Sequence, residues 1–173
     1  PVFAPLNANL NVYIEYSNET WNWAFGQSHD IYDMANAEVK AGGSHLNCDG
    51  ETNTYALGWR YPARRTVDIS NLFRGVFGDG DMITRVRPVL EFQYADFNNT
   101  ASLGLDFINN YYNNGDGGNH VANPHPVGYY LWGAGGAVYY NSGNDAASTV
   151  DGIYASGFPY FGGANTYQSI LNT

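Results

Sequence analysis

The sequence predicts an α/β fold built from parallel strand and helix units. Strand-like and helix-like segments alternate along its 173 residues, which is the pattern of βαβ crossovers. No Asn-Gly turn joins two strand-like segments, as a hairpin would require. Neither an internal repeat nor a linker divides the chain, so we expect one domain over residues 1–173.

Three segments have the character of strands. The first, 11–16, alternates in a two-residue period, with Val12, Ile14 and Tyr16 on one side and Tyr13 and Glu15 on the other,. The second, 82–92, is rich in Ile, Val and Leu, but it contains Arg85, Arg87 and Pro88. Proline lacks a ladder donor, so we expect this strand to bulge or end early, and we expect the two arginines to pair with carboxylates. The third, 127–132, leads into a glycine-rich turn at 133–136.

Helical spacing predicts four helices. The first covers 27–41 and stops at Gly42-Gly43, and the second begins near Pro62 and ends at Gly78,. A third is expected over 101–112, and Asp145 would cap a fourth that reaches residue 154. The intervening stretches 42–53 and 113–126 are polar and rich in turn-forming residues, which predicts loops.

Composition limits the function. Hydrophobic residues make up 44% of the chain, enough for one core, and no apolar run approaches the roughly 18–20 residues of a membrane span,. The formal charge of −9 argues against nucleic acid as a partner,. An acidic surface with few lysines suits a secreted or extracellular protein that handles neutral polymers.

The most informative segment is Tyr16-Ser-Asn-Glu-Thr-Trp-Asn22, which directly follows the first strand. It places an amide at Asn18 and a carboxylate at Glu19 at the strand's carboxyl end, where α/β barrels carry their active sites. Trp21 and Trp23 follow, and aromatic rings can stack on the apolar faces of sugars. These residue types together predict a carbohydrate-active domain that binds a polysaccharide or oligosaccharide.

This segment resembles the Asn-Glu signature that closes the fourth strand in clan A glycoside hydrolases, the retaining (β/α)8 enzymes. The blocks Arg60-Tyr-Pro-Ala-Arg-Arg, Arg85-Val-Arg-Pro-Val-Leu90 and Gly133-Ala-Gly-Gly-Ala-Val-Tyr-Tyr140 look like those that follow it in a cellulase-like branch. The resemblance implies part of a TIM barrel, a glycosidase activity on a β-linked polysaccharide, Glu19 as general acid/base, and Asn18 bound to a sugar hydroxyl. It also implies that Tyr139 and Tyr140 lie near the sugar, although a core position suits them equally well.

A retaining mechanism needs a second carboxylate about 5–5.5 Å from the first, and no match to the family's nucleophile is found. A complete barrel typically needs about 250 residues. We therefore expect a fragment or processed chain that requires the remaining half of the barrel or a second copy of itself. Glu91, near the end of the second strand, could approach Glu19 as a substrate-binding residue or, as a weaker alternative, as the second carboxylate. The residue type alone favours a solvated charge at the rim.

Cofactor chemistry has little support in the sequence. His29, His45, His120 and His125 are too widely spaced for a convincing zinc site, although the last two could share an ion in one loop,. No glycine-rich phosphate loop or serine nucleophile motif occurs. We expect neither a metal nor another cofactor.

Alternatives remain for the key residues and for the function. Glu19 could stabilise the first turn of a helix, and Asn18 could cap a backbone. The whole chain could instead be a non-catalytic extracellular module that binds glycans or assembles with itself.

Overall fold

The structure is a computed structural model that describes residues 7, 9–93 and 96–137. Through Gly136 these residues belong to one compact unit. Its elements, in chain order, are β1 (Val12–Ile14), α1 (Gly26–Ala41), α2 (Thr54–Phe77), β2 (Val86–Gln93), α3 (Phe97–Thr100), α4 (Ser102–Phe107), the π-helical turn η2 (Ile108–Tyr112), α5 (Val127–Tyr130) and β3 (Gly133–Ala137). The prediction of a single domain over all 173 residues remains a prediction, because it extends beyond the described residues.

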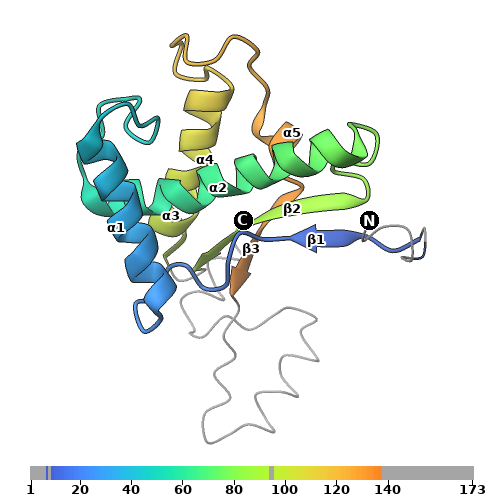
Figure 1. Ribbon diagram of the computed structural model, residues 1–173, viewed down its shortest axis with the longest axis horizontal. Coiled ribbons are helices and arrows are strands. Elements are labelled where there is room, and N and C mark those ends of the chain that lie inside the picture. Colours follow the sequence, from blue (N-terminus) through green and yellow to red (C-terminus); the bar gives the residue numbers. More distant parts are fainter. Residues whose placement is uncertain (1–6, 8, 94–95, 138–173) are drawn as a thin grey trace, which may run out of the picture. The chain divides into compact units, whose positions relative to one another are not determined.

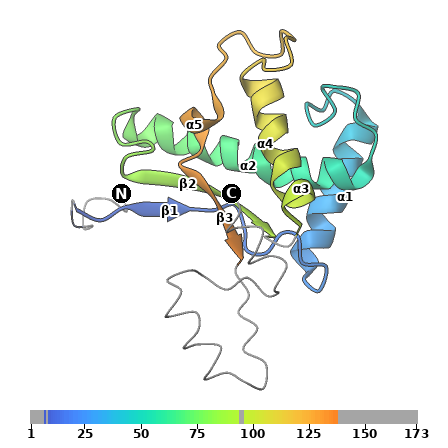
Figure 2. The ribbon, with the colours of Figure 1, turned by 180° about the vertical axis from the view of Figure 1, so that it is seen from behind.

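The three strands form a parallel sheet in the order β1-β2-β3. Strand order therefore follows chain order, so both crossovers advance across the sheet in the same direction. Because such crossovers are right-handed, their helices belong on one face of the sheet. The ribbon shows α2, α4 and α5 on the same side of β1 and β2, with α1 beyond the end of the strands (Figures 1 and 2). The predicted α/β class with parallel βα units is confirmed.

Side chains of β2 alternate strictly between the two faces of the sheet. The buried set points to the helices, as shown by Leu90, which belongs to the main core cluster. The half-buried set lies on the opposite face and is mostly polar: Arg87, Val89, Glu91 and Gln93. The sheet thus has one apolar face packed on helices and one face that carries functional groups.

Helix α1 confirms the first helical prediction, with Ile31 and Ala35 buried one turn apart and an end at Gly42, whose φ is 86°. Helix α2 corrects the second. It starts at Thr54 because the side chain of Asn53 accepts from the N–H groups of Tyr55 and Ala56,. Pro62 therefore lies inside the helix and not at its start.

The third strand prediction is wrong. Residues 127–130 form the short helix α5, which Pro126 precedes with φ of −66°, and the strand follows in the segment expected to be a turn. Close packing explains the change: a Cβ at Gly135 would lie 3.2 Å from Cγ1 of Val89 on β2. Small residues let β3 approach β2, and they remove the hydrophobic alternation that would have identified the strand.

Pro88 lies inside the central strand, so the expected bulge or early end is also wrong. Its carbonyl oxygen accepts from the N–H of Trp132 at 2.8 Å. In a strand, the N–H and C=O of one residue point to the same neighbouring strand. The N–H that Pro88 lacks would therefore have pointed toward the segment before β3, and not toward β1. The proline removes no bond from the ladder with β1.

The helix expected at 101–112 is interrupted and begins earlier, as α3, α4 and η2 in succession. The helix expected at 145–154 lies outside the described residues. Among those residues, no helix combines the length and hydrophobicity of a membrane span.

Candidate functional site

Glu19 lies in the loop that leaves the carboxyl end of β1. Its φ is 47°, in the left-handed region that residues with a side chain rarely adopt,. Asn22 holds it twice, by a backbone N–H to Glu19 O at 2.9 Å and by Nδ2 to Oε2 at 2.8 Å. Ser28 of α1 donates to the carbonyl of Asn22 at 2.7 Å and so fixes the turn. Strained backbone that its surroundings hold in place is common at functional sites.

The local alternatives for Asn18 and Glu19 do not fit this geometry. Helix α1 begins only at Gly26, has no acidic residue in its first turn, and shows no side-chain cap at Phe25. Glu19 is therefore not a helix-start carboxylate, and Asn18 does not cap α1. Asn18 is exposed, and its backbone oxygen accepts from Nε2 of Gln27 at 3.0 Å.

The structure brings Glu91 next to Glu19, as the spacing of neighbouring strands predicts. The Glu91 carboxyl hydrogen-bonds the side chain of Glu15 and accepts from the backbone N–H of Glu19. Burial, followed by the hydrogen bond and charge of Glu15, raises the pKa of Glu91 from 4.5 to about 7,. A carboxyl group that exchanges its proton near neutral pH therefore lies at the carboxyl edge of the sheet.

The two tryptophans have different environments. Trp21 is only 4% exposed, so its ring cannot stack on a ligand from solvent. The prediction that it stacks on sugar is therefore wrong, and the ring packs in the core. Its buried indole Nε1 has no hydrogen-bond partner among the described residues. Trp23 is 40% exposed and stays a candidate. Tyr139 and Tyr140 lie outside the described residues.

The face of the sheet opposite the helices carries an aromatic and cationic stack. The guanidinium carbon of Arg87 lies 4.9 Å from the ring centre of Trp132 and 5.4 Å from that of Tyr13. Arg87 donates from Nη1 to the Tyr13 hydroxyl at 2.6 Å and from Nε to the backbone oxygen of Thr84 at 3.0 Å. The expected pairing of Arg87 with a carboxylate is thus replaced by contacts to neutral groups.

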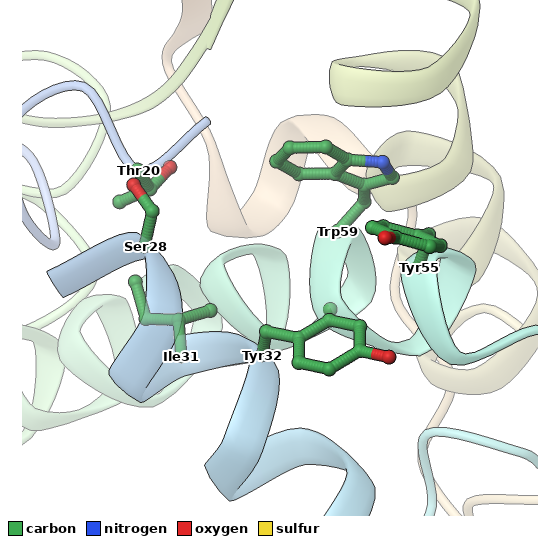
Figure 3. Close-up of a pocket in the computed structure, with 7 residues that line it drawn as sticks. Thr20, Ser28, Ile31, Tyr32, Tyr55 and Trp59 are labelled. Carbon is green, nitrogen blue, oxygen red and sulfur yellow. The ribbon is translucent and has the colours of Figure 1, made fainter. Parts of the chain in front are cut away.

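Two small hollows flank the Glu19 loop, and both include Thr20 in their walls. One has a cavity volume of about 10 Å³, room for a single water, and contains Glu91, Tyr16 and Ser17 among its lining residues,. The other, of the same cavity volume of about 10 Å³, lies between α1 and α2, with Tyr32, Tyr55 and Trp59 in its wall (Figure 3). The loop that carries Glu19 therefore separates a carboxyl-bearing hollow from an aromatic one.

The histidines do not form a metal site in the described part of the chain, where no group of three His, Cys, Asp or Glu side chains has suitable geometry. His120 bonds Asp116 at 2.8 Å, whereas His125 stacks on Tyr129 with ring centres 3.9 Å apart. The two histidines of the loop thus contact different residues.

Sequence reasoning missed three participants: Glu15, Asn22 and Tyr55. Asn22 follows Glu19 by three residues, a spacing at which one turn brings two side chains together, and that signal was available. The contact of Glu15 with Glu91 depends on how the end of β1 lies against β2, and Tyr55 depends on the packing of two helices. No local pattern reveals either.

The chain matches no family model, no curated protein sequence and no solved structure.

Proposed function

We propose that this domain acts on a neutral β-linked glycan and hydrolyses it with carboxyl groups at the carboxyl edge of the sheet. The observation that carries the proposal is the meeting of Glu91 with Glu15 and with the Glu19 loop at the ends of two adjacent parallel strands. Active sites of parallel α/β folds lie at this edge. Glycoside hydrolysis needs carboxyl groups that hold a proton near neutral pH.

In this proposal Glu19 is the general acid/base, and Asn18 binds a sugar hydroxyl. The bond from Asn22 supports the role of Glu19 because it fixes the direction of the carboxylate. Glu91 supports the position of the Glu19 loop because its carboxyl accepts from the backbone N–H of Glu19. Glu15 and Glu91 are in direct hydrogen-bond contact, closer than the about 5–5.5 Å of an acid and a nucleophile in a retaining enzyme. They are therefore not proposed as that pair.

A non-catalytic glycan-binding module is the second candidate. It is favoured by exposed aromatic rings, since Trp23, four residues after Glu19, is 40% exposed and Tyr13, on the face of the sheet opposite the helices, is 55% exposed. Aromatic rings bind sugars without any need for a second carboxylate. A binding module would retain glycan affinity and show no hydrolysis.

The test is hydrolysis of soluble β-glucan, mannan and xylan between pH 5 and pH 8, measured by the release of reducing ends. Glu19→Gln should lower the rate by at least about 100-fold, the size of general acid/base catalysis, and leave glycan affinity within about twofold. Asp106→Asn, at an exposed position of α4, is the control. Full activity of Glu19→Gln would reject the acid/base role, and affinity without hydrolysis in the parent would select the binding module.

A further inference from the structure

The face of the sheet opposite the helices, here called the open face, carries an arginine that no carboxylate neutralises. Four other arginines each form an ion pair with an aspartate or glutamate: Arg60, Arg64, Arg65 and Arg74. Within the described residues none of the ion pairs includes Arg87. Glu15 and Glu91 lie on the same face, but their carboxyl groups hydrogen-bond each other. A guanidinium without its own countercharge can bind an anionic ligand.

Arg87 lies between two exposed aromatic rings. Its guanidinium carbon is 4.9 Å from the ring centre of Trp132 and 5.4 Å from that of Tyr13, and the two rings meet edge to face with their centres 5.2 Å apart. Tyr13 is the register partner of Arg87, and the backbone N–H of Trp132 bonds the carbonyl oxygen of Pro88. Tyr13 is 55% exposed and Trp132 is 45% exposed. The strands therefore hold both rings beside the cation, with ring surface facing solvent.

Two hydrogen-bond donors beside these rings find no acceptor in the described part of the chain. Arg87 donates from Nε to the backbone oxygen of Thr84 and from Nη1 to the Tyr13 hydroxyl. The side-chain oxygen of Asn11, with its amide turned toward Arg87, accepts from Nη1 at 3.0 Å and from Nη2 at 3.2 Å. Each Nη carries two hydrogens, so one hydrogen of Nη2 is left, and the Tyr13 hydroxyl still has its own hydrogen to donate. These adjacent donors suit the two oxygens of a carboxylate.

The open face selects a ligand that combines a carboxylate with a flat apolar ring surface. The carboxylate would accept from Arg87 and Tyr13, and the C–H face of a sugar ring would stack on Trp132 without any enclosing cavity. An acidic peptide offers carboxylates but no such ring face. The net charge of −9 repels anions at long range, but salt screens exposed charges beyond about 8 Å at physiological ionic strength. The local cation therefore decides which ligand binds.

We propose that the open face of the sheet binds one uronic acid unit of a β-linked glycan, with the carboxylate on Arg87 and Tyr13 and the sugar ring on Trp132. The inference rests on the proposed function for the glycan, and it adds that this otherwise neutral polymer carries acidic units. Arg87 and Glu91 are four residues apart on one strand, which corresponds to about 13 Å. The acidic unit would therefore bind away from the carboxyl edge at which hydrolysis is proposed.

The test compares two pairs of oligosaccharides that differ only by a carboxylate, with affinity for the complete 173-residue chain measured by calorimetry. One pair is cellotetraose and the same sugar oxidised to a carboxylate at one C6. The other is xylotetraose with one glucuronic acid branch and the same compound with that carboxyl reduced. The acidic member of at least one pair should bind about tenfold more tightly, the size of one charge-assisted hydrogen bond. Sodium chloride at about 0.5 M should reduce this preference.

Three variants separate the contributions of charge, donor and ring. Arg87→Gln removes the charge and should reduce the preference for the acidic sugar to less than about twofold. Tyr13→Phe keeps the ring and Arg87 but removes one donor, so the preference should fall about threefold even if Arg87→Gln folds poorly. Trp132→Ala removes the stacking surface, and it should weaken both members of a pair about fivefold without changing their ratio.

Arg65→Gln is the matched control, because it changes the net charge by the same amount at a side chain of α2 that is 40% exposed. It should keep the parent's preference. Equal affinity for the two members of each pair would overturn the inference, as would a preference that survives in both Arg87→Gln and Tyr13→Phe. A tetra-aspartate peptide that binds as tightly as the acidic sugar would also overturn it.

The outcome for the open face is separable from that for the proposed function. If the preference for a carboxylate is absent while Glu19→Gln still lowers hydrolysis, the inference fails and the proposed function stands. If Arg87→Gln loses the preference while Glu19→Gln has no effect on hydrolysis, the open face is a binding site for acidic glycans and the acid/base role of Glu19 fails.

Discussion

Asn22 holds Glu19 at both ends of the residue, with its backbone N–H on the carbonyl oxygen at 2.9 Å and its side-chain amide on the carboxylate at 2.8 Å. The first bond closes the turn, and the second orients the acid. One residue thus maintains the left-handed backbone of Glu19 and the direction of its side chain. The orientation of the proposed acid is a property of the loop and does not need a bound ligand.

Replacing Asn22 with alanine tests this relationship. The variant keeps the backbone bond and loses two side-chain bonds, the one to the Glu19 carboxylate and the one that Oδ1 accepts from the N–H of Ala24 at 3.0 Å. We therefore expect the free energy of unfolding to fall by about 1–2 kcal/mol. Urea unfolding followed by circular dichroism measures the change. Asn119→Ala, at an exposed loop position, should change it by less than about 0.5 kcal/mol. Equal values for the two variants would show that the side-chain bonds of Asn22 contribute nothing.

The pKa of Glu91 predicts a dependence of stability on pH. Folding raises this pKa from 4.5 to about 7, so the protonated carboxyl favours the folded state. Its contribution is complete below pH 4.5 and is lost as the pH rises through about 7,. The full shift would correspond to roughly 3 kcal/mol, and partial exposure of the group reduces this to about 1 kcal/mol.

The measurement is urea unfolding at pH 5 and at pH 8 for the parent chain and for Glu91→Gln. Glutamine cannot ionise, so the variant should lose about 1 kcal/mol of the difference between the two pH values. Asn119→Ala, an uncharged substitution at an exposed loop position, serves as the comparison and should retain the parent's difference. A parent-like difference in Glu91→Gln would contradict the raised pKa.

The elements that the sequence predicts correctly are those whose signals lie in neighbouring residues. Helix α1 was predictable because Ile31 and Ala35 recur at helical spacing and two glycines end the run. The start of α2 is set by the cap at Asn53, but Pro62 is typical of a first helical turn and indicated a later start. Strand β3 consists of small residues, which allow it to lie close to β2, so its sequence lacks the alternation of apolar and polar residues that identifies a strand.

The candidate site divides in the same way. Glu19 and Asn18 lie within five residues of the end of β1 at Ile14, so their place at its carboxyl end was predictable from order alone. Whether Trp21 or Trp23 faces solvent depends on the turn between them, and the sequence offers both rings equally. The contact between Glu15 and Glu91 joins residues from two strands, and only the folded chain reveals it.

Of these substitutions, the one that removes the carboxylate paired with Arg60 should cause the largest loss of stability. Arg60 is 5% exposed and bonds both carboxylate oxygens of Asp49, at 2.8 and 2.7 Å, and the backbone oxygen of Leu46 at 2.8 Å. Asp49→Asn removes the two short bonds and leaves the buried guanidinium with the more distant carboxylate of Glu51, at 4.0 Å, so we expect unfolding to become about 3 kcal/mol easier,. Thermal and urea unfolding measure this. Asp68→Asn is the matched control, because its partner Arg65 is about 40% exposed and such pairs contribute about 0–1 kcal/mol.

Two glycines in helices should respond to alanine in opposite directions. A Cβ at Gly104 of α4 would lie 3.0 Å from Cβ of Ala63 on α2 and 3.4 Å from Cδ2 of Leu90 on β2. Gly104→Ala must therefore separate α4 from α2, and we expect a loss of about 1–3 kcal/mol in urea unfolding. At Gly75 of α2 nothing lies within 4 Å of the added methyl group. Gly75→Ala should therefore stabilise the chain by about 0.5–1 kcal/mol. A Gly104→Ala variant as stable as Gly75→Ala would mean that α4 does not pack on α2 and β2 at this distance.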